Sequence, residues 1–299
     1  MKRVIANWRL RTRTLELGRR TLVCGVVNIT PDSFSDGGSF LDPEAALVRC
    51  IECIDEGADF LDLGAESTRP GSNAGGAQPA VSADEEQQRL LPVLEGVLRA
   101  RPDVVLSVDT YKSATARVAL AVGAEIINDV SGFIWDPGLA QVCSDFGAGI
   151  VLTHTRGRPG EWREQPQLEG DALLKMVRDG LAASVAAAEK AGVPREAIVL
   201  DPGYGFGKRF GENYALLARQ AELLELGRPL LAGLSRKSFL GHTLAPLSGG
   251  GSAPFDAREN ASLAAMTAAI LNGASIVRVH DVRASVEAAR IADAILSAF

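Results

Sequence analysis

The stretch EIINDVSGFIWDPGLAQVCSDFGAGIVLTHT, residues 125–155, contains the pattern that decides the fold. Two short apolar runs, 125–131 and 149–155, flank a longer segment of helical character. Nearly continuous apolar runs of this length are typical of parallel strands that are covered on both faces. The stretch therefore predicts one strand–helix–strand unit.

The same unit recurs along the whole chain. Eight apolar runs are present, at 22–30, 60–67, 104–110, 125–131, 149–155, 198–202, 230–235 and 275–281, and Ala-rich helical patterns such as 173–191 and 260–272 lie between them. A glycine suited to a left-handed helix C-cap precedes four of the runs, at Gly57, Gly123, Gly192 and Gly273. Eight βα units predict an α/β fold with a single (β/α)8 TIM barrel. A doubly wound open sheet is the alternative, but no GxGxxG follows the first run.

The N-terminal residues stand outside this rhythm. Residues 8–23 alternate polar and apolar through Leu10, Thr12, Leu15 and Leu17, and Gly18 is a turn signal. We expect residues 1–21 to form an extension with a β-hairpin that caps the bottom of the barrel, and residues 22–299 to form the barrel domain.

Two loops also interrupt the rhythm. Residues 69–81 are rich in Gly, Ala, Asn and Pro and are expected to form a long mobile loop after the second strand. Residues 243–255 contain SGGGSAP and are interpreted as a flexible surface connection, with a catalytic lid as the alternative.

The charge balance narrows the function classes. The 299 residues carry 37 acidic and 31 basic side chains, a net charge of −6, and 23% of them are charged. This balance argues against a disordered chain and against a general binder of nucleic acid or anionic membranes. No apolar run approaches the roughly 18 residues of a membrane helix and no apolar signal region follows the basic N-terminus, so we expect a cytoplasmic protein.

The four cysteines give no sign of a metal site. Cys50 and Cys53 have CxxC spacing but lie in an amphipathic helical segment, with no second pair and no histidine cluster to complete a ligand set. They are interpreted as core thiols one turn apart.

Polar side chains gather where the predicted strands end. A strand buried on both faces does not tolerate them unless they pair with one another or with a ligand, and in a TIM barrel the strand ends form the active site. Taken singly, an acid or amide here is more often a helix N-cap, but the recurrence around one rim favours a shared ligand. The residues in question are Asn28, Glu66, Thr68, Asp109, Asn128, His154, Asp201, Lys237, Arg278 and His280.

The chemistry of this set divides by charge. The cations or potential cations suit a phosphate or diphosphate group, and they are Arg69, Lys237, Arg278 and His280. Asp109, Asn128 and Asp201 suit a flat heterocycle rich in N–H donors. No GxSxG elbow, Walker loop or Ser/His/Asp nucleophile pattern is present, so covalent and P-loop mechanisms have little support.

Seven sequence blocks resemble those of the dihydropteroate synthase family. They are VVNITPDSFSDGG (26–38), LGAESTRPG (63–71), SVDT (107–110), INDVSG (127–132), LDPGYGFGK (200–208), GLSRKSFLG (233–241) and VRVHDV (277–282). Each stands at a predicted strand end and they occur in order. The resemblance extends from about residue 10 to the C-terminus.

The resemblance implies a reaction and a set of roles. Members of the family condense p-aminobenzoate with hydroxymethyl-dihydropterin diphosphate in a Mg²⁺-dependent step that gives dihydropteroate and pyrophosphate. The diphosphate is thought to leave before the amine attacks, so no protein nucleophile is required. Carried over, the pterin and diphosphate residues are Thr68, Asp109, Asn128, Asp201, Phe206, Lys237, Arg278 and His280, and the Mg²⁺ ligand is Asn28.

The resemblance also assigns the loops after the first two strands. It implies catalytic roles for Asp32, Ser33, Phe34, Asp36 and Arg69, together with Lys237. It places Phe34, Thr68, Pro70 and Ser238 around p-aminobenzoate, with Ser238 near the carboxylate at a helix start. Both loops are expected to be open without ligands, and the family forms homodimers.

The chain departs from the family pattern at three places. Ala65 replaces a common glycine, Thr153 replaces a common methionine, and the loop 69–81 is longer than usual, which we interpret as a neutral surface insertion rather than a change in sulfonamide sensitivity. His154 is interpreted as a packed, hydrogen-bonded barrel residue. Two alternatives stay open, a methyltetrahydrofolate:corrinoid methyltransferase-like protein and a catalytically silent pterin-binding paralogue.

Overall fold

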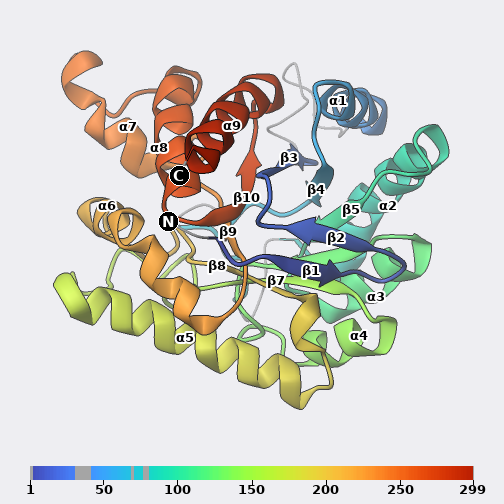
Figure 1. The fold of residues 1–299 in the computed structure, drawn as a ribbon. Coiled ribbons are helices and arrows are strands. Elements are labelled where there is room, and N and C mark those ends of the chain that lie inside the picture. The colour runs from blue at the N-terminus through green and yellow to red at the C-terminus, as the bar shows by residue number, and fades with distance from the viewer. Residues whose placement is uncertain (1–2, 31–41, 69–70, 77–80, 299) are drawn as a thin grey trace.

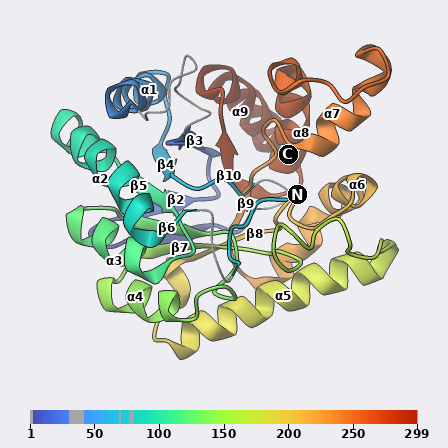
Figure 2. The ribbon, with the colours of Figure 1, turned by 180° about the vertical axis from the view of Figure 1, so that it is seen from behind.

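Eight parallel strands form a closed barrel in the computed structural model, which describes residues 3–30, 42–68, 71–76 and 81–298. The strand order is β10-β3-β4-β5-β6-β7-β8-β9. Figures 1 and 2 show the helices surrounding this barrel. The predicted TIM barrel is therefore confirmed. Its strands are β3 (Leu22–Asn28), β4 (Phe60–Gly64), β5 (Leu106–Asp109), β6 (Ile126–Asp129), β7 (Gly149–Thr153), β8 (Ile198–Asp201), β9 (Leu230–Ala232) and β10 (Ala274–Val279).

The helices alternate with the strands along the described chain. They are α1 (Pro43–Asp55), α2 (Ala83–Ala100), α3 (Ser113–Val122), α4 (Gly138–Phe146), α5 (Gly170–Lys190), α6 (Phe210–Ala218), α7 (Ser238–Thr243), α8 (Glu259–Leu271) and α9 (Val282–Ser297). The short helix α7 is an addition between β9 and α8. The predicted C-cap glycines 57, 123, 192 and 273 all have positive φ, as a chain turning back from helix to strand requires.

The predicted strands are too long at their carboxyl ends. Run 60–67 ends as a strand at Gly64, run 230–235 at Ala232, and run 22–30 at Asn28. The residues beyond these points belong to the loops above the barrel. Strand β10 instead begins one residue earlier than predicted, at Ala274.

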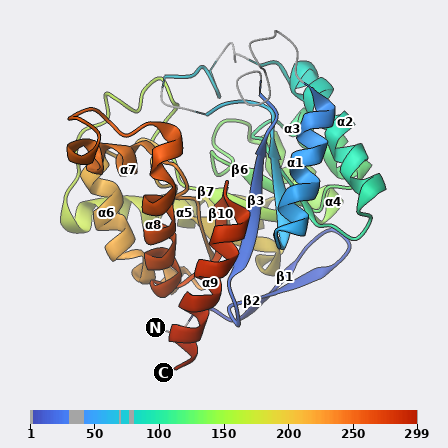
Figure 3. The same cartoon turned by 90° about the horizontal axis from the view of Figure 1, so that it is seen from above.

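A hairpin seals the bottom of the barrel, as predicted. Strands β1 (Ala6–Arg9) and β2 (Thr14–Leu17) pair antiparallel, and Figure 3 shows them below the barrel strands. Trp8, Leu10 and Leu17 are buried in one apolar cluster with bottom residues of the barrel strands. The Trp8 indole Nε1 donates to the Ala197 carbonyl at 2.8 Å.

The position of the hairpin turn differs from the prediction. The turn spans residues 10–13, where the Leu10 amide donates to the Arg13 carbonyl at 2.8 Å. Gly18 follows the second strand and has φ +94°, and a Cβ there would lie 2.4 Å from the Val4 carbonyl oxygen. The pattern marked a true turn residue but assigned it to the wrong turn. A domain division at residues 21 and 22 stays a prediction, with β3 beginning at Leu22.

The two CxxC cysteines are core thiols, as interpreted from the sequence. Cys50 and Cys53 are fully buried free thiols on α1. Burial raises the pKa of Cys50 to about 12 and that of Cys53 to about 11. Thiols that stay protonated at neutral pH are poor metal ligands and nucleophiles.

The described part of the second-strand loop, residues 71–76, packs against the protein body. Ala74 is buried with Tyr111 and Val130, and the Arg158 guanidinium donates to the Gly75 carbonyl. These contacts anchor the loop at Ala74 and Gly75, and its mobility stays a prediction. Residues 69, 70 and 77–80 lie outside the described part.

The loop 243–255 also contains more structure than predicted. It includes a short 3-10 turn at Ala245–Leu247, and a second 3-10 turn, Phe255–Arg258, begins at its end. Leu247 is 84% exposed, in accord with a surface connection, whereas Phe255 reaches the barrel mouth. Across the described residues, no helix combines the length and apolar character needed to cross a membrane.

We predict that the hairpin contributes substantially to the stability of the barrel. Leu17→Ala removes a fully buried side chain from the bottom cluster, and the cavity should lower the free energy of unfolding by about 2–5 kcal/mol in urea denaturation. The control is Ile5→Ala, because Ile5 adjoins the same hairpin but is 65% exposed and should change stability by less than about 0.5 kcal/mol. Equal effects of the two substitutions would contradict a sealing role.

Candidate active site

The predicted rim residues converge on one cavity above the barrel. Its volume is about 270 Å³. Helix α7 and the loops after β3, β4, β8, β9 and β10 contribute to its wall. The predicted site residues that line it are Asn28, Thr68, Asp109, Phe206, Lys237, Ser238, Arg278 and His280.

Asn128 and Asp201 lie beneath this cavity rather than in its wall. Both are buried at the carboxyl ends of their strands, β6 and β8. A Cβ added to Gly233, which lines the cavity, would lie 3.7 Å from Asp201 Oδ2. A ligand that reaches Gly233 therefore approaches the Asp201 carboxylate. The predicted residues Asp32, Ser33, Phe34, Asp36, Arg69 and Pro70 lie outside the described residues.

The floor of the site is a buried ionic network centred on Arg278. The guanidinium of Arg278 donates from Nε to Asp62 Oδ2 at 2.6 Å and from Nη2 to Asp109 Oδ2 at 2.7 Å. The Asn128 amide donates to the same Asp62 oxygen at 2.8 Å. A planar guanidinium with fixed donors suits this two-carboxylate arrangement. The network joins β4, β5, β6 and β10 across the barrel.

Burial sets the protonation of this network. Burial raises the pKa of Asp109 to about 7, against the opposing attraction of Arg278. Burial alone would lower the pKa of Arg278, but Asp62 and Asp109 raise it above its ordinary value, so the guanidinium stays charged. Gly64 leaves room for Asp109, because a Cβ there would lie 3.3 Å from the Asp109 Cβ.

A second charged group, Lys237, faces the cavity from the loop after β9. Lys237 Nζ lies 3.8 Å from the centroid of the Phe206 ring. Burial lowers the pKa of Lys237 to about 8, with Asp201 opposing and Arg278 adding to the shift. Burial raises the pKa of Asp201, whose Oδ1 accepts a hydrogen bond of 2.8 Å from the Gly203 amide. Lys237 and Arg278 thus bring positive charge to the cavity of a protein whose net charge is negative.

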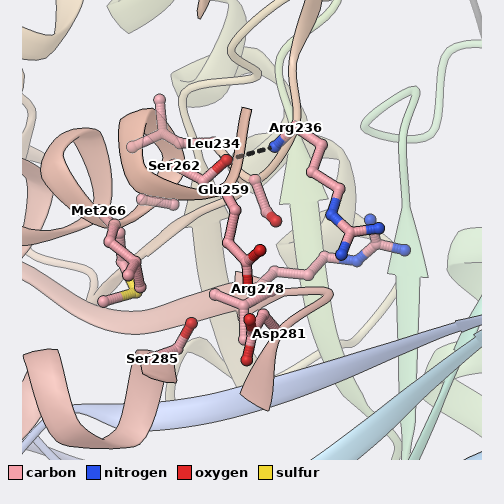
Figure 4. Close-up of a pocket in the computed structure, with 12 residues that line it drawn as sticks. Leu234, Arg236, Glu259, Ser262, Met266, Arg278, Asp281 and Ser285 are labelled. Atoms are coloured by element: carbon pink, nitrogen blue, oxygen red, sulfur yellow. Dashed lines mark hydrogen bonds between the residues drawn. The ribbon is translucent and has the colours of Figure 1, made fainter. Parts of the chain in front are cut away.

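The loop after β9 is held in an uncommon backbone conformation. Arg236 has φ +58°, a value that few residues with a side chain adopt. Its amide donates to Ser262 Oγ at 2.8 Å and its carbonyl accepts from Arg258 Nη1 at 3.0 Å. Figure 4 shows the Ser262 contact, with the Arg236 and Arg278 side chains extending away from Met266. Hydrogen bonds to the peptide groups before and after Arg236 stabilise this conformation. Lys237 is the next residue in the chain.

His280 and Phe255 form the outer wall near α7. His280 Nδ1 lies 3.0 Å from Ser235 Oγ, and the Phe255 ring contacts the His280 ring edge-on with centroids 5.7 Å apart. The Arg236 guanidinium lies 4.9 Å from the Phe255 centroid. Ser238 is the first residue of α7, as predicted.

The donor set available to a metal is small. Asn28 lines the cavity, and its side-chain amide can offer an oxygen ligand. The described residues include no cluster of three or more His, Cys, Asp or Glu side chains that would hold a metal by itself. This donor set fits Mg²⁺, which keeps several waters and is commonly held by one or two protein oxygens together with substrate phosphates.

A second buried cluster supports the end of β4. Lys112 Nζ lies 2.6 Å from Glu66 Oε2 and 3.3 Å from Glu86 Oε2, and all three side chains are buried. Thr110 and Thr115 donate to Glu86. The cluster fixes the segment that carries Thr68, two residues after Glu66.

His154 is packed, as interpreted from the sequence, but its ring is not hydrogen-bonded as expected. It is buried, and its Nδ1 has no hydrogen-bond partner among the described residues. Burial lowers its pKa well below the ordinary value, so the ring stays neutral. Its main-chain carbonyl accepts from Lys208.

Two residues of the site, Asp62 and Phe255, do not lie at the predicted strand ends and were not predicted. Asp62 lies in the middle of β4, in FLDLG, where it is 1% exposed and holds both Arg278 and Asn128. A single acid inside an apolar strand is a signal that could have identified it, since such a group must be paired. Phe255 could not be predicted because it ends a Gly- and Ser-rich loop that is typical of a surface connection.

We predict that Asp109 makes stability fall as pH rises. Its pKa of about 7 in the folded state exceeds the ordinary 3.8, so between these values the folded state holds a proton that the unfolded state has released. Stability therefore decreases with rising pH over this window. Asp109→Asn lacks this contribution, so the free energy of unfolding of the unmodified protein relative to that of the variant should drop from about pH 4 to about pH 7. A pH-independent difference in urea denaturation would contradict this.

Comparison with known proteins agrees with the fold and identifies the family. A family model described as "Pterin binding enzyme" matches residues 24–280. Dihydropteroate synthase of Escherichia coli is 41% identical over 276 residues, which cover 92% of each chain. The structure resembles dihydropteroate synthase of Yersinia pestis in a sulfonamide drug complex, with a TM-score of 0.86, 38% identity and coverage of 98% of this chain and 100% of that one.

A third relative was solved with a pterin compound bound. Dihydropteroate synthase of Xanthomonas albilineans in complex with 7,8-dihydropteroate has a TM-score of 0.81 and 37% identity, and the match covers 97% of this chain and 99% of that one. The matches extend over the barrel and its strand-end residues. The chain therefore belongs to the dihydropteroate synthase family of pterin-binding enzymes.

Proposed function

We propose that the cavity condenses p-aminobenzoate with hydroxymethyl-dihydropterin diphosphate, giving dihydropteroate and pyrophosphate. The observation that carries the proposal is the combination of buried acceptors below the cavity with two cations, Lys237 and Arg278, that line it. A flat heterocycle with N–H donors matches the acceptors, and a diphosphate matches the cations. The family's activity in folate biosynthesis agrees with this chemistry.

The pterin ring would lie deepest. Asp201 Oδ1 is used by the Gly203 amide, which leaves Oδ2, next to Gly233, to accept from the ring. Asn128 and Asp109 would provide further contacts from β6 and β5, held in place by Asp62 and Arg278. Phe206 offers an aromatic face beside Lys237.

The positive groups would stabilise the leaving diphosphate. Arg278, Lys237 and His280 line the cavity, and the guanidinium and ammonium are fixed before substrate arrives. Fixed charges that face developing negative charge lower the barrier to bond cleavage. Departure of the diphosphate leaves a cationic pterin methylene, which the nearby carboxylates stabilise and which the amine then attacks. This order requires no protein nucleophile.

Asn28 would hold Mg²⁺ together with the diphosphate and water. The bound ion supplies charge neutralisation of the diphosphate oxygens. His280, in the same cavity wall, would contact the diphosphate.

The amine substrate would bind nearer to solvent. Thr68 and Ser238, which line the cavity, would contact this substrate. On the family resemblance, Phe34 and Pro70 contact the aromatic ring, and Asp32, Ser33, Asp36 and Arg69 complete the site from the first two loops. We also propose a cytoplasmic homodimer that has neither nucleic acid nor membrane as a partner.

The decisive test is turnover. Purified protein with Mg²⁺, p-aminobenzoate and the pterin diphosphate should release pyrophosphate and form dihydropteroate, and excess EDTA should abolish both. Pterin binding without any product above a no-enzyme control would instead identify a silent paralogue.

The Asp201 role has its own test. Asp201→Asn replaces one acceptor oxygen by an amide donor and should weaken pterin binding by at least about tenfold, the loss expected for a hydrogen bond to a charged group. Calorimetric titration with 6-hydroxymethylpterin measures this. Asp171→Asn is the control, because Asp171 pairs with Arg219 on the surface of α5. An unchanged dissociation constant for Asp201→Asn would refute the assignment.

A further inference from the structure

Lys208 is a buried lysine whose side-chain hydrogen bonds all go to main-chain oxygens. Its Nζ donates to the carbonyls of Gly203 at 2.7 Å, His154 at 3.1 Å and Phe206 at 3.3 Å. In the described part of the chain no salt bridge joins it to a carboxylate. The three N–H groups of an ammonium match these three acceptors. Burial lowers the pKa of Lys208 to about 7, with Asp201 opposing the shift.

These carbonyls belong to two neighbouring strand ends. His154 directly follows β7, whereas Gly203 and Phe206 lie in the turn after β8. The two segments are in direct contact: Gly203 has φ +71°, and a Cβ there would lie 1.9 Å from the His154 carbonyl oxygen. Only glycine fits at this position. Lys208 therefore holds the turn 203–207 against the end of β7.

The other side of this turn faces the pterin part of the cavity. The Gly203 amide donates to Asp201 Oδ1, and the Phe206 ring lies against Lys237 Nζ. A Cβ added to Gly205 would lie 3.3 Å from Lys237 Cδ. The turn thus sets the positions of both the carboxylate and the ammonium.

We propose that Lys208 is a positioning residue for pterin binding, which acts by fixing the turn 203–207 and, through it, Asp201 and the Phe206–Lys237 pair. Lys208 does not itself contact the substrate. The inference rests on the proposed function for the identity of the ligand.

A second side chain supports the same turn from α6. Asn213 is buried, its Oδ1 accepts from the Gly205 amide at 2.7 Å, and its Nδ2 donates to the Lys208 carbonyl at 3.3 Å. The turn is therefore held through its main chain from two sides. Asn213 offers an independent way to release it.

The test uses Lys208→Met in the full chain, which keeps the length of the side chain and removes its donors. Calorimetric titration with 6-hydroxymethylpterin should give a dissociation constant about tenfold higher than that of the unmodified protein. In steady-state turnover, KM for the pterin diphosphate should rise by a similar factor, while KM for p-aminobenzoate should stay within about twofold. A structural defect spread over the barrel would not produce this split.

The matched control is Trp8→Phe. It also removes a buried hydrogen bond to a main-chain carbonyl, that of Ala197, but at the bottom of the barrel. It should lower the melting temperature and leave the dissociation constant for pterin unchanged. If Lys208→Met does not fold by near-UV circular dichroism, Asn213→Ala carries the same test with the same expected split.

Two results would overturn the inference. One is a folded variant that binds pterin as the unmodified protein does, and the other is an equal rise in KM for both substrates. Failure of the proposed function looks different, because the unmodified protein would then give no product or bind no pterin.

Discussion

The arrangement of the site depends on how Arg278 is paired inside the barrel. A guanidinium taken out of water costs several kcal/mol unless carboxylates meet it in good geometry, and Asp62 and Asp109 do so from β4 and β5. Together with the Asn128 amide, which also donates to Asp62, this pairing links four strands of the barrel. Asp62 Oδ2 accepts from both Arg278 and Asn128, and Asp109 lines the cavity. The network thus provides both the local rigidity and the polar surface of the site.

The barrel could be predicted from the sequence because each of its strands and helices is marked by a local pattern of residues. Each strand is an apolar run, each helix has its own periodicity, and the closed parallel sheet follows from eight repeats. The predicted gathering of polar side chains at one rim is also seen in the lining of the cavity, since the strand ends of one barrel lie at the same edge. Pairings across the barrel could not be predicted in this way: Asp62 and Arg278 are 216 residues apart, and no local pattern relates them. Lys208 was missed as a support for the same reason, because its acceptors are main-chain atoms, which the sequence does not distinguish.

The charge distribution shows why net charge is a poor guide to ligand chemistry. The chain carries −6, yet Lys237 and Arg278 place positive charge where a diphosphate would bind. Interactions between solvent-exposed charges are screened over about 8–10 Å at physiological salt, whereas groups in a buried cavity are screened far less. The acidic side chains that face solvent therefore contribute little at the cavity. Two cations close to the ligand outweigh them.

The hairpin at the bottom of the barrel has a consequence for how the chain is made. Its residues precede the barrel strands in the sequence and leave the ribosome before them, but the cluster that covers Trp8 and Leu17 includes Leu231 and Ile276 from the last two strands. The hairpin cannot reach its final packing until nearly the whole barrel has been synthesised. During that interval its apolar side chains lack their partners, and such exposed surface favours aggregation. Closure of the barrel in biosynthesis is therefore a late event that joins the two ends of the chain.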